Sequence, residues 1–330
     1  MKRKKTNLAA MALSALLCFT AGAVTDPTYK VTVKEGTEDA ANWTIDPAAA
    51  TNTGVKAGTT ITAAYGGTKK VKSVKAKKKA EAGYAATEYN EASWDGTKVV
   101  LTKKTAASTP VAVADANTAV TWGAGWYTVS GNVTINGKVT LTADTYLILQ
   151  DGATLTINGQ LNCNANSKSL YIYGQGKGDG KLNVSYAYGT VIKGGENKNL
   201  EIHGGEITAE GTGFSDALWF GHIKVFSGKL TANAPLSEGI YFYNSIKVYG
   251  GEVEGSGDDY GIESANYGST LTVYDGKVKG TGSGGGFKSD IQSGTEGIKF
   301  YFSDDGNTWD AGTYYGTATY APNKRYGKAE

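Results

Sequence analysis

A short motif that recurs from residue 147 onward limits this chain to a small number of architectures. Each copy alternates apolar and polar residues, turns on a pair such as Asp-Gly, Gly-Gly or Ser-Gly, and then alternates again. This period of two is typical of β-strands with one buried face. The copies lie 23 to 30 residues apart and begin at Leu147, Leu170, Leu200, Ile223, Ile246, Leu271 and Ile298. A repeat this short cannot bury its apolar face alone, so neighbouring copies must stack.

The apolar positions of each repeat predict three short strands per turn of a continuous coil. The copy-start residues and the residues two positions later, from Leu149 to Phe300, form two inward columns on the first strand. The second strand points inward at Leu182, Ile207, Leu230, Val253 and Val278, and the third at Val191, Leu218, Ile240, Ile262 and Phe287. A propeller needs about 40 or more residues per blade, and a leucine-rich repeat needs an asparagine signature that is missing here. We therefore predict an all-β fold containing a parallel β-helix of about six to eight turns.

The composition agrees with a β-rich chain. The sequence has 46 glycines and 21 tyrosines but only two methionines, a profile that disfavours a helical bundle. Its net charge of +2 includes four basic residues at positions 2–5. Without those four, 29 of the 33 basic residues remain against 31 acidic ones, so no charge excess indicates a nucleic-acid partner.

The spacing, the glycine turns and the alternation over about residues 120 to 303 resemble the right-handed parallel β-helix family. Within that family the chain is most similar to secreted bacterial β-helix proteins described as carbohydrate-binding, which are relatives of the pectate-lyase architecture. The resemblance implies a right-handed coil and a polysaccharide as the partner.

The N-terminus has the features of a signal peptide. Four basic residues precede the apolar stretch 8–19, which is too short to span a bilayer, and Ala21-Gly22-Ala23 follows. We expect cleavage after Ala23, a secreted or cell-surface protein, and no membrane span. Cys163 is then the only cysteine left, so it is expected to lie unpaired in the core.

The remaining chain divides by composition and pattern. Short strand-like runs at 29–33, 43–46, 59–65 and 71–76 indicate a small β module, for which an Ig-like topology is one option. Residues 105–118 are small, polar and unpatterned. We predict a signal peptide at 1–23, the β module at 24–104, a linker at 105–118, the β-helix at 119–303 and a C-terminal cap or tail at 304–330.

Two outward columns of the predicted coil carry further information. The residues before the second-strand column alternate in charge: Lys181, Glu206, Lys229, Glu252 and Lys277. Such alternation gives each charge an opposite neighbour on adjacent turns, which supports the register. On the first strand, the second outward column is a series of rings: Tyr173, His203, Phe226, Tyr249, Tyr274 and Tyr301.

The ring column has two interpretations. Stacked rings stabilise one another along a sheet. A long exposed stripe of rings also suits a polysaccharide, because sugar C–H faces rest on aromatic rings and a polymer needs an extended surface rather than a pocket. In the second interpretation the contact surface also includes Trp219, Tyr241, Lys224, Lys247 and Lys299, and the lysines favour an acidic glycan.

The sequence contains little that indicates catalysis. The resemblance implies that a lyase would use clustered carboxylates to hold calcium and an arginine or lysine as the base, but Arg325 in the tail is the only arginine outside the signal peptide. Asp258, Asp259 and Glu263 are a candidate calcium site, although aspartates are ordinary turn residues. We expect no cofactor and a non-catalytic polysaccharide-binding protein. A polysaccharide lyase or glycoside hydrolase on the same coil, or a structural or adhesive surface protein, remains an alternative.

Overall fold

The computed structural model describes residues 84–163, 168–308, 310–312 and 324–330, together with the backbones of strands at 29–31, 43–46, 62–65, 76–78 and 319–320. The chain divides into two units, Met1–Gly83 and Tyr84–Glu330. In the first, β1 (Tyr29–Val31) pairs antiparallel with β4 (Ala76–Lys78), and β2 (Trp43–Asp46) pairs antiparallel with β3 (Thr62–Tyr65). The predicted signal peptide at 1–23 lies outside the described residues.

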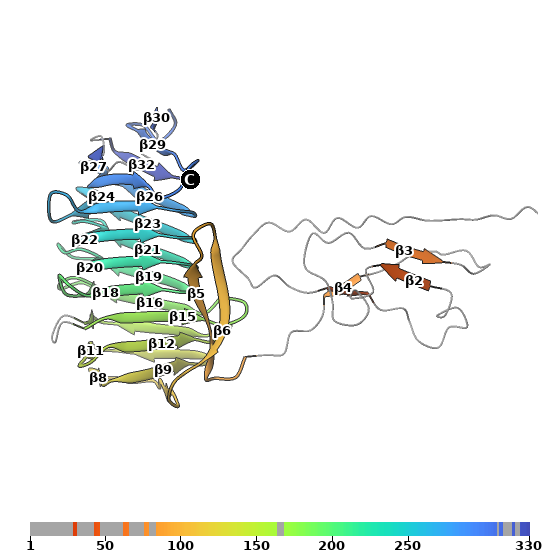
Figure 1. The fold of residues 1–330 in the computed structure, drawn as a ribbon. Helices are drawn as coiled ribbons and strands as arrows, with labels where there is room; N and C mark the ends of the chain where they lie inside the picture. The colour runs from red at the N-terminus through yellow and green to blue at the C-terminus, as the bar shows by residue number, and fades with distance from the viewer. Residues whose placement is uncertain are drawn as a thin grey trace, which may run out of the picture. The chain divides into compact units, whose positions relative to one another are not determined.

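The second unit is a β-solenoid of about seven turns, and no helix occurs among its described residues (Figure 1). Its turns carry three parallel strands, as the sequence predicts. The first set is β9 (Gly125–Val129), β12 (Thr145–Leu149), β15 (Leu170–Gly174), β18 (Asn199–Ile202), β20 (Leu218–Val225), β22 (Ile240–Val248), β25 (Thr270–Val273) and β28 (Asp290–Ser293). The second is β10 (Asn132–Ile135), β13 (Thr154–Asn158), β16 (Lys181–Tyr186), β19 (Glu206–Gly211), β21 (Lys229–Ala234), β23 (Glu252–Gly257) and β26 (Lys277–Thr281).

The third set begins with strands of only two or three residues, and in two turns its strand is continuous with the strand of the first set. It consists of β8 (Val120–Trp122), β11 (Val139–Leu141), β14 (Leu161–Asn162), β17 (Ile192–Lys193), the first halves of β20 and β22, β24 (Tyr260–Ser264) and β27 (Gly285–Lys288). The continuous strands β20 and β22 therefore cross a corner of the coil that the other turns interrupt with a loop.

The predicted register is correct in the middle of the coil and shifts at both ends. Leu200, Ile223, Ile246 and Leu271 pair in sequence, and all are fully buried. Leu147 pairs with Ile172 rather than with Leu170, because β12 already begins at Thr145. Each fully buried side chain of this size contributes about 1.5–3 kcal/mol, so the continuous column needs no disulfide. Cys163 is fully buried in the same core, as predicted, and burial raises the pKa of its thiol.

The charge column and a glycine column mark the turn between the first and second strands. Lys181 Nζ lies 2.5 Å from Glu206 Oε2, and Lys229 Nζ lies 3.4 Å from Glu252 Oε1, so the predicted alternation forms ion pairs between turns. Just before this column, glycines adopt positive φ on successive turns: Gly205, Gly228, Gly251 and Gly276. A Cβ on Gly251 would lie 2.4 Å from the carbonyl oxygen of Gly228. Only glycine therefore fits this turn.

The C-terminal end departs from the repeat. The turn after Leu271 is completed by Ile291 of β28, and Ile298 is not a further copy of the column. Instead β29 (Phe300–Ser303) pairs antiparallel with β30 (Asp310–Gly312) and β32 (Tyr326–Ala329), while β31 (Thr319–Tyr320) pairs antiparallel with β28. Antiparallel strands cannot continue a parallel coil, and the fully buried Phe300 closes the core.

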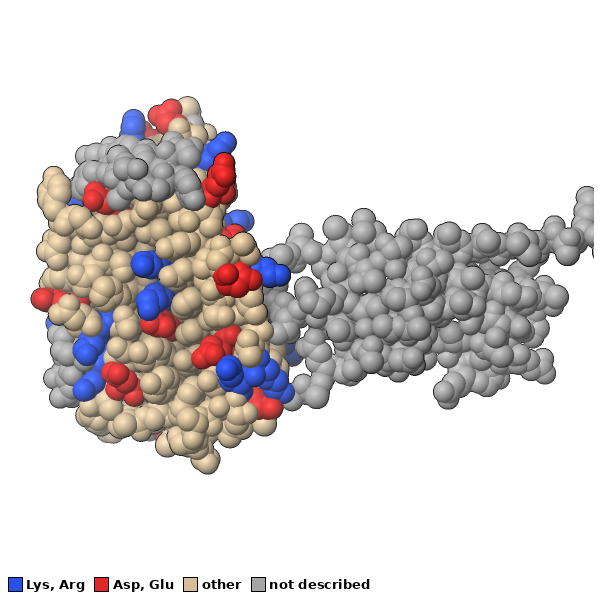
Figure 2. All heavy atoms as spheres, in the orientation of Figure 1, with Lys and Arg blue, Asp and Glu red and all other residues tan. Residues whose placement is uncertain are grey.

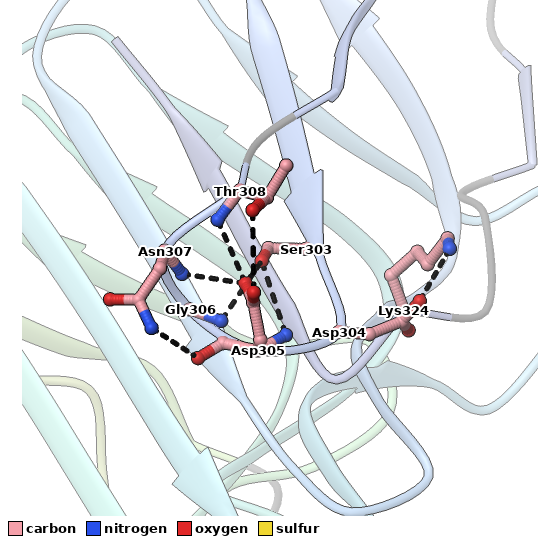
Figure 3. A network of polar contacts seen from close by, with 7 residues as sticks. All are labelled: Ser303, Asp304, Asp305, Gly306, Asn307, Thr308 and Lys324. Atoms are coloured by element: carbon pink, nitrogen blue, oxygen red, sulfur yellow. Dashed lines mark hydrogen bonds and ion pairs between the residues drawn. The ribbon is translucent and has the colours of Figure 1, made fainter.

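A network of polar contacts holds the turn after β29 (Figure 3). Asp305 Oδ1 accepts hydrogen bonds from the backbone N–H groups of Thr308 (2.8 Å) and Asn307 (2.7 Å) and from the hydroxyl of Ser303 (2.9 Å). These bonds, those from the backbone first, lower the pKa of Asp305 to about 2. Lys324 Nζ lies 2.6 Å from Asp304 Oδ2. Both aspartates therefore stabilise the C-terminal antiparallel strands that close the coil.

The domain boundary differs from the prediction. Strands β5 (Glu88–Trp94) and β6 (Val99–Thr105) form an antiparallel hairpin that runs across the stacked strands of the coil (Figure 1). The hairpin belongs to the second unit, so the predicted module boundary at 104 is wrong. The predicted linker at 105–118 is also wrong in part, because β7 (Val111–Ala112) pairs with β9 as the first, partial turn.

Candidate functional site

The ring column of the first strand set forms a stack, as parallel pairing requires. The ring centroids are 4.7 Å apart for Tyr173 and His203, 4.9 Å for His203 and Phe226, 4.7 Å for Phe226 and Tyr249, and 4.6 Å for Tyr249 and Tyr274. We call these stacked side chains the ring ladder. A second stack on the same face contains Trp126, Tyr146 and Tyr171.

The hairpin packs on the ring ladder and buries Tyr173 and His203, while Phe226, Tyr249 and Tyr274 stay partly exposed. The Tyr89 ring lies 4.4 Å from Tyr173 and 4.8 Å from Trp126. Near the other end of β5, Trp94 lies 6.0 Å from Tyr249 and 5.8 Å from Tyr274. Tyr173 is only 5% exposed and His203 only 7%. The predicted outward exposure of these two rings is therefore wrong, because a segment outside the repeat packs on them.

Polar contacts fix the hairpin on the coil. Asn90 Nδ2 donates to the carbonyl oxygen of Gln175 at 3.0 Å, and Gln175 Nε2 donates to the carbonyl oxygen of Glu88 at 2.8 Å. Nδ1 of His203 lies 2.8 Å from the carbonyl oxygen of Ala92. The hairpin is a separate two-stranded sheet, and such a hairpin is marginal alone in water, so the ring ladder is the surface that orders it.

The remaining predicted ring, Tyr301, lies elsewhere. It belongs to the antiparallel cap strand β29, where it pairs with Lys328, whose Nζ lies 4.9 Å from the Tyr301 ring centroid. Lys299 precedes the same strand, is exposed, and exchanges backbone hydrogen bonds with Glu330. The structure therefore does not bring Tyr301 or Lys299 to the other predicted contact residues.

The other predicted residues do share one surface. They lie on the two longest strands, β20 and β22, whose outward side chains are all partly exposed. We call this surface the β20–β22 platform, and it comprises Trp219, His222, Lys224, Tyr241, Tyr243, Ser245 and Lys247. Sequence reasoning missed Tyr243, His222 and Ser245 because a shift in strand pairing between Phe220 and His222 interrupts the period of two.

The aromatic part of the platform is a set of rings at several angles. Tyr243 meets Trp219 edge to face at 5.5 Å and Tyr241 at 5.9 Å. Lys193 Nζ, one turn earlier, lies 5.0 Å from the Trp219 ring centroid. Because the rings belong to paired strands, the backbone that carries them is in place without a ligand.

Carboxylates border these rings on the corner where the third strand begins. The Ser237 hydroxyl donates to Asp216 Oδ1 at 3.0 Å and lies 2.8 Å from Glu238 Oε2. The Ser237 hydroxyl thus lies between the two carboxyl groups, and the proximity of Glu238 adds to burial in raising the pKa of Asp216. Glu263 of the next turn is 8% exposed and accepts a hydrogen bond from Lys288 Nζ at 2.6 Å.

The candidate calcium residues do not form a metal site with one another. Asp258 and Asp259 are exposed in the loop before β24, whereas Glu263 lies within that strand and is paired with Lys288. Among the described residues, no group of three or more histidine, cysteine, aspartate or glutamate side chains could hold a metal ion.

The Asp216–Glu238 pair predicts a pH dependence of stability. Burial, followed by Glu238, raises the pKa of Asp216 from 3.8 to about 7. The folded state thus holds a proton that the unfolded state releases near pH 4, so this contribution to stability is lost as the pH rises from about 4 to about 7. Asparagine at position 216 keeps the acceptor for Ser237 and does not ionise. We expect Asp216→Asn to gain stability relative to the wild type between pH 4 and 8.

Thermal unfolding of both proteins across this pH range measures that difference. Asp275→Asn, in an exposed turn, is the matched control and should follow the wild type. A constant difference between Asp216→Asn and the wild type at every pH would contradict the raised pKa of Asp216.

A row of exposed apolar side chains lies on the loops beside the carboxylates. Tyr188, Phe214 and Leu236 belong to the corner loops of three successive turns and are 89%, 86% and 43% exposed. Their sequence signal is an apolar residue within a glycine- or serine-containing loop, which the repeat alignment does not include. Apolar residues gathered on one exposed edge often mark a binding surface.

Neither a family model, nor a curated protein, nor a solved structure matches this chain. Within the described residues, no helix is both long enough and apolar enough to cross a membrane. The function is therefore inferred from the chemistry of the surface.

Proposed function

We propose that this protein binds a polysaccharide along the β20–β22 platform, as a secreted or cell-surface protein without catalytic activity. The observation that carries the proposal is the group of partly exposed rings Trp219, Tyr241 and Tyr243 on adjacent turns, bordered by groups that can hydrogen-bond to hydroxyls. Sugar C–H faces rest on such rings, and the partly exposed carboxyl groups of Asp216 and Glu238 can accept hydrogen bonds from sugar hydroxyls. The basic and apolar N-terminus of the sequence supports export.

The extent of the surface favours a polymer. Adjacent turns are about 4.8 Å apart, and the loop row of Tyr188, Phe214 and Leu236 continues the surface beyond the carboxylates. A small molecule is normally enclosed by a pocket, whereas a chain of sugars can contact several turns at once. The ring ladder, on which the hairpin packs, is not part of this proposal.

Hydrolysis is less well supported than binding. Glycosidases place two carboxyl groups at least about 5 Å apart, on either side of the scissile bond. Ser237 Oγ lies 3.0 Å from Asp216 Oδ1 and 2.8 Å from Glu238 Oε2, so one hydroxyl already occupies the space between these two carboxyl groups. Their arrangement is better suited to holding hydroxyls.

The double variant Trp219→Ala/Tyr241→Ala tests the proposal. We expect a loss of affinity of at least about tenfold in a glycan-array or polysaccharide pull-down, because buried aromatic contacts dominate such interfaces. Melting temperature should change little, since both side chains lie outside the core. Tyr301→Ala, in the cap, is the control and should bind as the wild type does.

The same samples should be assayed for new reducing ends and unsaturated uronates. A double variant that folds and binds like the wild type would contradict the platform. Product formation by the wild type would show that the protein is an enzyme rather than a non-catalytic binding protein.

A further inference from the structure

The outward columns of the coil show two ways of arranging charge. In the column Lys181, Glu206, Lys229, Glu252 and Lys277, every pairing of adjacent turns joins opposite charges. On β20 and β22 this rule is broken, because Lys224 pairs directly with Lys247. Like charges directly opposite each other on adjacent strands are destabilising.

Among the described residues, only one of these two lysines has an acidic partner. Lys224 Nζ lies 2.8 Å from Glu201 Oε1 on the preceding turn. On the following turn, the residue opposite Lys247 is the uncharged Thr272. Lys247 forms no ion pair with any residue that the structure describes. Within the described part of the chain its ammonium group therefore has no counter-charge, and it lies opposite a second lysine.

A third donor lies two residues before Lys224 on the same face. Nδ1 of His222 is 2.9 Å from the hydroxyl of Ser245, which is opposite it on β22. Burial, and after it the charges of Lys224 and Lys247, lower the pKa of His222, so the ring is neutral at neutral pH. When Ser245 donates to Nδ1, the proton of the neutral ring is on Nε2, and no described residue bonds to Nε2.

We propose that Lys247, Lys224 and His222 form a subsite for an anionic group on the bound glycan, either a carboxylate or a sulfate ester. The inference rests on the proposed function and names its substrate class, an acidic polysaccharide. An anion here pairs with Lys247, relieves its repulsion with Lys224 and accepts the Nε2–H of His222. Charge-assisted hydrogen bonds of this kind are about twice as strong as neutral ones.

The position of the subsite complements the rest of the platform. The strand order places Trp219 before His222 and Lys224, and Tyr241 before Ser245 and Lys247. Trp219 and Lys224 are five residues apart along β20, a span of about 16 Å, so a glycan resting on the rings reaches the lysines by extending along the strands over several sugar units. The carboxylates Asp216 and Glu238 lie at the opposite end, so a polyanion should bind at the lysine end.

Binding of paired polymers to the full-length protein tests this subsite. The probes are polygalacturonate against its methyl ester for carboxylates, and dextran sulfate against dextran for sulfate esters. We expect Lys247→Gln to weaken binding of at least one acidic polymer by about tenfold at low ionic strength. The loss should shrink as salt is added, because salt screens the wild-type interaction.

Lys229→Gln is the matched control, because Lys229 is also partly exposed but is already paired with Glu252 and Glu254. It should leave binding unchanged, and an equal loss in both variants would show non-specific attraction and overturn the subsite. A second outcome is that the protein binds neutral and acidic polymers equally and that only Trp219→Ala/Tyr241→Ala weakens binding. This outcome would overturn the subsite but keep the proposed function. Acidic binding that depends on Lys247 and not on Trp219 would keep the subsite and reject the aromatic platform.

Discussion

Replacing Tyr89 with alanine is expected to destabilise the protein by about 3 kcal/mol, the lower end of the range for removing a large buried ring. Tyr89 is 6% exposed and packs between Trp126 and Tyr173. Its removal leaves a cavity between the hairpin and the ring ladder that the paired strands of the coil cannot collapse to fill. Chemical denaturation measures the loss in free energy of unfolding.

Hydrogen exchange of β5 and β6 shows where the loss occurs. We expect amide protection in the hairpin to fall before protection in the coil, because few polar contacts hold the two together. Tyr188→Ala removes an equally large side chain that is 89% exposed, and it should be nearly neutral. A Tyr89→Ala protein as stable as Tyr188→Ala would show that the hairpin does not depend on the ring ladder.

Replacing Gly251 with alanine is expected to cost a similar amount, by a different mechanism. The φ of Gly251 is 77°, which costs a side-chain-bearing residue about 1 kcal/mol. The added methyl would lie 2.4 Å from the carbonyl oxygen of Gly228, which itself accepts a hydrogen bond from Glu252 N–H. Displacing that backbone adds about 2 kcal/mol of overpacking. The expected total is about 3 kcal/mol in denaturant unfolding.

Gly268 separates the two contributions. Its φ is 82°, but a Cβ there would meet nothing within 4 Å. Gly268→Ala should therefore cost only about 1 kcal/mol. Equal losses at Gly251 and Gly268 would mean that the positive φ alone accounts for the cost. The close approach between turns at Gly251 would then add nothing.

The repeat predicted the coil and most of its register because parallel pairing places equivalent residues on top of one another. The same logic correctly stacked Tyr173 through Tyr274. It failed where the chain leaves the repeat. Residues 298–303 keep the alternation of a strand but run antiparallel, and alternation alone does not carry a direction.

The covering of the ring ladder could not be read from the repeat, because the hairpin is made from residues 88–105. A local signal was present, since Asp95-Gly96 is a typical hairpin turn and Gly96 has a φ of 104°. The local signal does not indicate which surface the hairpin packs on. In the sequence, nothing distinguishes Tyr89, Ala92 and Trp94 from other strand residues, and their role depends on the coil surface that they contact.

The hairpin also changes how the coil should respond to force. A solenoid is held mainly by contacts between neighbouring turns, so its end turns can peel away one after another. Here Tyr89 contacts Trp126 near the start of the coil, and Trp94 contacts Tyr274 near its end. Pulling along the coil axis must therefore shear a single hairpin from several turns at once. The hairpin therefore couples these turns mechanically, and they should unfold together at one high force rather than in a series of small steps.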